Sequence, residues 1–66
     1  MNAKELVKGK TYRYTQGVYP IEIVYLDGVF NKYVFRNYWS KVERTLTYLT
    51  VLKFVEEINS DKNGRF

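Results

Sequence analysis

The residues of this chain that could do chemistry are aromatic rings and cations that alternate with them, and not the usual catalytic groups. The sequence holds no histidine and no cysteine, which excludes an imidazole base, a thiol nucleophile and a Cys/His zinc site. Ser40 has no recognisable activating base, and the adjacent Glu56 and Glu57 would diverge by about 100° on a helix. We therefore expect a protein that is not an enzyme and that carries no metal or cofactor.

Rings beside cations are the ingredients of single-strand nucleic-acid binding, where bases stack on rings and cations follow the phosphates. With 11 Lys+Arg against 7 Asp+Glu, the net charge of +4 permits an anionic partner without requiring one. A simpler interpretation is that the rings fill a small core and the cations form its solvated outer face. The candidate partner-binding residues are Arg13, Tyr14, Tyr19, Arg36, Tyr38, Trp39, Lys41 and Arg44.

A groove for a protein or peptide is the competing hypothesis. The loops 15–19 and 37–41 each bring aromatic residues next to polar ones, and together they could hold an extended peptide. Trp39 is the best single candidate because tryptophan is enriched at interface hot spots, but it could instead cover the core at a strand end. We expect protein interaction first and nucleic-acid binding second. A single contiguous patch would favour nucleic acid if it contained Arg13, Lys32, Arg36 and Arg44.

The elements that position these residues are predicted to be strands. Residues 10–15 alternate, with Tyr12 and Tyr14 on one side, and residues 42–49 alternate again. Between them, 19–26 and 30–38 are rich in β-branched and aromatic residues. The links are too short for parallel crossovers, so the sheet must be mainly antiparallel.

The central hairpin has two possible registers around Asp27-Gly28, the strongest turn signal of the chain. A two-residue loop there would put Lys32 and Arg36 on the apolar face. An odd-numbered loop leaves both cations outside, where Glu22 could pair with either of them. We favour the odd loop because buried cations are costly. The odd loop places Ile21, Ile23, Tyr33 and Phe35 together on one inward face.

After the strands the period changes to that of a helix. Val51, Val55 and Ile58 are spaced i, i+4, i+7, and Thr50 precedes them as a helix N-cap. The sequence therefore predicts a helix over 51–58 that docks on the sheet. Residues 59–66 are polar and are expected to form a flexible tail after a single domain of residues 1–58.

The fold class expected is mainly β, a small antiparallel sheet of four to five twisted strands with one short C-terminal helix. A Gly-x-x-Tyr motif at residues 9–12 and a Thr-x-x-x-Phe-x-x-x-Ile motif at 50–58 resemble small bacterial SH3-like barrel domains. The resemblance covers most of residues 9–58 and implies a half-open SH3-like barrel. That superfamily hosts binding modules with unrelated partners, so it implies a fold rather than a particular partner.

The cellular setting is predicted from what the sequence lacks. The first ten residues contain no apolar run long enough for a signal peptide, and no window approaches the roughly 20 apolar residues of a membrane span. We expect a cytoplasmic protein without a membrane partner. An exposed edge strand offers a route to a weak homodimer, and a monomer is equally compatible with the sequence.

Overall fold

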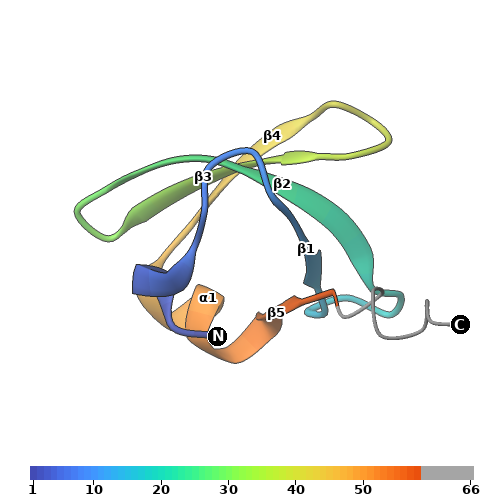
Figure 1. The fold of residues 1–66 in the computed structure, drawn as a ribbon. Coiled ribbons are helices and arrows are strands. Elements are labelled where there is room, and N and C mark those ends of the chain that lie inside the picture. The colour runs from blue at the N-terminus through green and yellow to red at the C-terminus, as the bar shows by residue number, and fades with distance from the viewer. Residues whose placement is uncertain (59–66) are drawn as a thin grey trace, which may run out of the picture.

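The structure, a computed structural model, describes residues 1–58 and consists of one antiparallel sheet with a short helix near its C-terminal end (Figure 1). The strands lie in the order β4-β3-β2-β1-β5, so the first four form a meander and the last returns beside the first. The mainly β fold class is thereby confirmed. The elements are η1 (Ala3–Glu5), β1 (Thr11–Tyr14), β2 (Ile21–Val29), β3 (Lys32–Asn37), β4 (Glu43–Leu46), α1 (Tyr48–Phe54) and β5 (Val55–Glu57).

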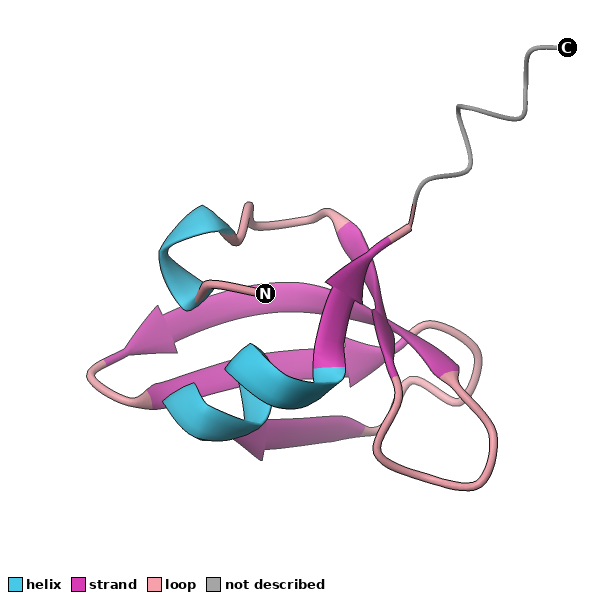
Figure 2. Ribbon diagram, turned by 90° about the horizontal axis from the view of Figure 1, so that it is seen from below, coloured by secondary structure: helices cyan, strands magenta, loops and turns pink. Residues whose placement is uncertain are grey.

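The core lies on the concave side of this twisted sheet, where η1 and α1 also pack (Figure 2). The alternation predicted for β1 is confirmed, because Tyr12 and Tyr14 are buried while Arg13 between them is exposed. The hydroxyl of Tyr12 accepts a hydrogen bond from the backbone N–H of Val7 at 2.9 Å, which satisfies its polar end inside the protein. The largest fully buried side chains come from five elements: Tyr12, Ile23, Phe35, Val51 and Val55.

The chain does not turn at Asp27-Gly28, which corrects the expected position of the hairpin loop. Both residues lie within β2, and the chain reverses at Phe30-Asn31, between the paired residues Val29 and Lys32. The φ angles of the two loop residues are 33° and 60°. Positive φ at both central positions is the backbone of a type I′ turn, the loop that suits the twist of a hairpin.

The predicted inward face is nevertheless correct, because a β-bulge in β2 supplies the odd residue that the sequence pattern places in the loop. Tyr25 pairs with Phe35 and Asp27 pairs with Val34, so Leu26 has no partner of its own on β3. The expected pairing of Glu22 with Lys32 or Arg36 is wrong. The guanidinium of Arg36 instead contacts the carboxylate of Glu43 on β4 at 3.2 Å. Lys32 and Arg36 are exposed, as expected.

The C-terminal elements differ from those predicted. The helix begins at Tyr48, where the predicted fourth strand was still expected to continue, and its N-cap is Thr47 in place of Thr50. The Thr47 hydroxyl accepts the backbone N–H of Thr50 at 3.3 Å. The helix ends at Phe54, and residues 55–57 form a strand beside β1. The predicted tail, residues 59–66, lies outside the described residues.

Gly28 is required by packing and not by a turn. A Cβ atom at this position would lie 2.9 Å from Cδ1 of Tyr33 and would also collide with the hydroxyl oxygen of Tyr25. We expect Gly28→Ala to lower the free energy of unfolding by roughly 1–3 kcal/mol, the usual cost of overpacking. Denaturant titration measures this loss. The matched control is Gly17→Ala, whose nearest neighbour would be at 3.7 Å, and an equal loss there would contradict the packing argument.

Phe30 is held in a backbone conformation that bulky residues disfavour, since its φ of 33° lies in the left-handed region. Its ring is 93 % exposed, so packing within residues 1–58 returns little for this strain. We expect Phe30→Gly to stabilise the fold by up to about 1 kcal/mol, because glycine adopts positive φ freely. Phe30→Ala removes the same ring but keeps a Cβ atom. A gain in thermal stability that appears equally in both variants would argue against backbone strain as the cause.

Candidate binding site

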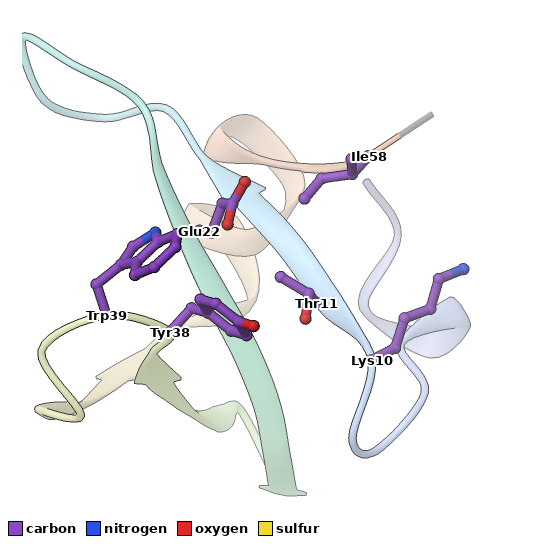
Figure 3. Close-up of a pocket in the computed structure, with 6 residues that line it drawn as sticks. All are labelled: Lys10, Thr11, Glu22, Tyr38, Trp39 and Ile58. Atoms are coloured by element: carbon purple, nitrogen blue, oxygen red, sulfur yellow. The ribbon is translucent and has the colours of Figure 1, made fainter. Parts of the chain in front are cut away.

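A hollow of about 540 Å³ lies on the outer face of the sheet, over β1 and β2 (Figure 3). Thr11 and Glu22 form its floor, because they alternate with the inward-facing residues Tyr12 and Ile23 on the same strands. The β3–β4 loop provides one wall, and residues near β5 and the start of β1 provide the other. The residues that line it are Lys10, Thr11, Glu22, Tyr38, Trp39 and Ile58.

The aromatic wall is held by a tightly bonded loop that follows β3. The Oδ1 atom of Asn37 accepts hydrogen bonds from the backbone N–H groups of Trp39 at 2.8 Å and Ser40 at 2.9 Å. The backbone N–H of Lys41 donates to the carbonyl of Asn37 at 2.9 Å, and that of Tyr38 donates to the carbonyl of Glu22. The loop is therefore fixed both to itself and to the floor of the hollow.

Trp39 is 74 % exposed, so it does not cover the core, which settles the alternative left open by the sequence. Its ring stands at 83° to the ring of Tyr38, with 4.8 Å between the ring centroids. This edge-to-face contact is the favoured geometry for an aromatic pair. The ammonium group of Lys41 lies 5.4 Å from the Tyr38 ring centroid. The wall is thus a preformed aromatic surface with a cation at its side.

Of the two charged side chains that line the hollow, one is ion-paired and the other is not. The ammonium of Lys10 is 3.5 Å from a carboxylate oxygen of Glu57 and 5.7 Å from the centre of the Tyr12 ring, which offsets its charge. Glu22 is half-buried in the floor, and its carboxylate makes no ion pair with any side chain of residues 1–58. The hollow therefore offers a partner a carboxylate that is not ion-paired but has Arg13 opposite it in the β1–β2 register.

The structure brings only some of the predicted site residues together. Tyr38 and Trp39 line the hollow and Lys41 flanks it, whereas Tyr14 is buried in the core. Tyr19 is 79 % exposed on the β1–β2 loop, at the same end of the sheet as the β3–β4 loop.

The predicted cations do not form one patch. Arg36 is paired with Glu43, and Arg13 stands in register between Glu22 and Glu56. Arg44 turns to the core side, where its guanidinium carbon lies 5.1 Å from the ring centroid of Tyr14. Its Nε atom is buried without a hydrogen-bond partner in the described part of the chain.

Sequence reasoning missed four residues of the hollow. Lys10, Thr11, Glu22 and Ile58 belong to segments that meet only through the pairing of β1 with β2 and β5. The alternation within β1 and β2 does mark Thr11 and Glu22 as outward-facing. No local signal places them beside Trp39, because that contact depends on the register of two hairpins.

Comparisons of the chain with models of known protein families, with curated proteins and with solved structures found no match. Within residues 1–58, no group of acidic residues is clustered so as to hold a metal ion. No helix in the same range is long and apolar enough to cross a membrane.

Among residues 1–58, two ionisable groups have displaced pKa values, and both lie at the β2 bulge, away from the hollow. The pKa of Asp27 is lowered by a hydrogen bond from Lys8, whose ammonium is 3.2 Å away, and by the backbone N–H of Gly28. The pKa of Tyr25 is raised, first by burial and then by the negative charge of Asp27.

The lowered pKa of Asp27 predicts a dependence of stability on acid. Its ionised form is favoured by the fold, so the stabilisation is complete above the unfolded pKa of about 4 and is lost as the pH falls through the folded pKa. In Asp27→Asn, unfolding free energies measured from about pH 5 down to pH 2 should therefore decline less than in the parent. Lys8→Met should flatten the same limb. An unchanged acid limb in both variants would show that the contact does not form in solution.

Proposed function

We propose that this protein is a non-catalytic binding module that accepts a segment of a protein partner in the hollow beside Trp39. The observation that carries the proposal is the preformed wall, where a tryptophan that is 74 % exposed stands edge-to-face against Tyr38 over a concave surface. Concave sites lined by aromatic rings with a few polar groups are typical of peptide recognition.

The loop geometry supports this function because it lowers the cost of binding. Side chains that must be ordered at an interface cost about 0.5–1.5 kcal/mol each. Here the backbone of residues 37–41 is already fixed by the side chain and carbonyl of Asn37. Glu22 in the floor gives the hollow a preference for a segment that places a cation beside an apolar side chain.

The nucleic-acid alternative has less support, since its basic residues are dispersed. Arg36 is engaged by Glu43, Arg44 lies against Tyr14, and Arg13 is flanked by carboxylates in the sheet register. Affinity for phosphates depends on several uncompensated cations along one surface.

We also propose that the fold belongs with SH3-like barrels and that the module acts in the cytoplasm. A four-stranded meander, a short helix and a final strand that pairs with the first are the features that support the fold proposal. The absence of cysteine is compatible with the proposed location.

The test uses fluorescently labelled, extended octapeptides that carry one central aromatic residue flanked by lysines. We expect their anisotropy to rise on titration with the protein and the emission of Trp39, the single tryptophan, to change in step. Trp39→Ala should weaken binding about 30-fold, the effect of removing a hot-spot residue worth about 2 kcal/mol. Lys53→Ala, in the last turn of α1, is the matched control and should bind like the parent.

Peptides with glutamates in place of the lysines should bind more weakly because they face Glu22. If none of the peptides binds, or if Trp39→Ala binds as well as the parent, the hollow is not the site. Short single-stranded oligonucleotides serve as the competing probe. Their tight binding at low salt, lost steeply as salt is added, would favour the nucleic-acid alternative.

A further inference from the structure

Large apolar side chains are exposed at both ends of the sheet. One group lies on the loops that precede β2 and follow β3, and its members Tyr38 and Trp39 line the hollow: Val18, Tyr19, Tyr38, Trp39 and Val42. The other group lies at the tip of the β2–β3 hairpin and on α1: Val29, Phe30, Tyr48, Leu49 and Leu52. Exposed apolar surface of this extent marks interaction sites on small proteins.

At the hairpin end, the Phe30 ring is the most exposed large apolar side chain. The ring projects 93 % exposed from a turn whose φ of 33° is unfavourable for phenylalanine. A strained residue whose side chain is not packed within its own protein suggests that the side chain contacts a binding partner. The Oδ1 atom of Asn31 accepts the backbone N–H of Tyr48 at 2.8 Å, which fixes the tip against the helix.

The helix adds to this surface because its apolar residues do not all face the core. Val51 is fully buried, while Leu49 is 61 % and Leu52 is 45 % exposed. Leu49 and Leu52 are three residues apart and therefore share one face of the helix. We define the knob as Val29, Phe30, Tyr48, Leu49 and Leu52, whose two segments are joined by the hydrogen bond between Asn31 and Tyr48.

The charges at the two ends differ. Lys32 follows the turn directly and is exposed beside the knob, and Lys53 lies on α1 next to Leu52. The hollow at the other end holds charges of both signs, with the half-buried carboxylate of Glu22 in its floor and Lys10 in its lining. Two knobs facing each other would bring lysines together, whereas a knob that faces a hollow brings Lys32 towards Glu22.

We propose that the partner of the hollow is a second copy of this chain, with the knob of one molecule inserting Phe30 beside Trp39 of the next. This inference rests on the proposed function, because it assigns the occupant of the same hollow. The contact joins two different surfaces, so it is heterologous. Each molecule keeps one free knob or one free hollow after pairing, and assembly continues head to tail into a ring or an open chain.

The test is a complementation experiment followed by sedimentation velocity. The parent chain should increase in mass with concentration, while Phe30→Gly and Trp39→Ala should each remain monomeric. Phe30→Gly suits this purpose because it removes the ring without adding backbone strain. Mixed in equal amounts, the two variants should form a 1:1 dimer and stop, since the one intact hollow meets the one intact knob.

A charge exchange tests the same contact independently. Lys32→Glu and Glu22→Lys should each reduce the association constant about tenfold, and the double variant should recover it. Val7→Ser is the control, since Val7 is 55 % exposed but belongs to neither end, and it should associate like the parent. Circular dichroism of every variant confirms folding before association is compared.

Three outcomes would overturn the proposal. Phe30→Gly that associates like the parent would exclude the knob. A mixture of the two variants that stays monomeric would indicate a symmetric contact or none. A parent chain that remains monomeric up to its solubility limit, while the lysine-flanked peptides still bind, would refute self-association and leave the binding function intact. If the peptides do not bind and the parent chain does not self-associate, both the proposed function and this inference are refuted.

Discussion

The fold depends on the single unpaired residue in β2, the bulge at Leu26. Side chains alternate strictly along a strand, so a shift of one residue exchanges the two faces. If β2 and β3 paired without a bulge from their Phe30-Asn31 turn, Ile23 and Tyr25 would face outward when Phe35 faced inward. With the bulge, all three are buried together. β2 also pairs with β1, so the same residue decides which face of β1 meets the core.

The local pattern of the sequence was sufficient for much of the core. Alternation correctly separated Tyr12 and Tyr14 from Arg13, and the cost of burying Lys32 and Arg36 selected the right inward face of the hairpin. The sequence pattern places a turn at Asp27-Gly28 because this pair favours turns. In the structure Gly28 meets a packing requirement, and the sequence gives no sign of that requirement. Gly28 is small because the rings of Tyr25 and Tyr33 lie against it.

The errors at the C-terminal end have a different cause. Val51 and Val55 are both buried with a spacing of four, which suits a continuous helix. Val55 is instead paired with Tyr14, a partner distant in sequence, and this pairing converts the end of the expected helix into a strand. The roles of the tyrosines were equally impossible to assign from local sequence. Tyr14 is core and Tyr38 lines the hollow, and only the tertiary register distinguishes them.

The pairing of β5 with β1 also has a consequence for the order of folding. The β2–β3–β4 meander is made of neighbouring strands, whereas the bond from the Thr15 hydroxyl to the Phe54 carbonyl spans 39 residues. Contacts of such long range form slowly, because a large loop must be closed before they are gained. The aromatic wall of the hollow belongs to the early, local part of the protein, and Ile58 follows the late part. Local opening of β5 would therefore take Ile58 out of one wall of the hollow while Tyr38 and Trp39 kept their places.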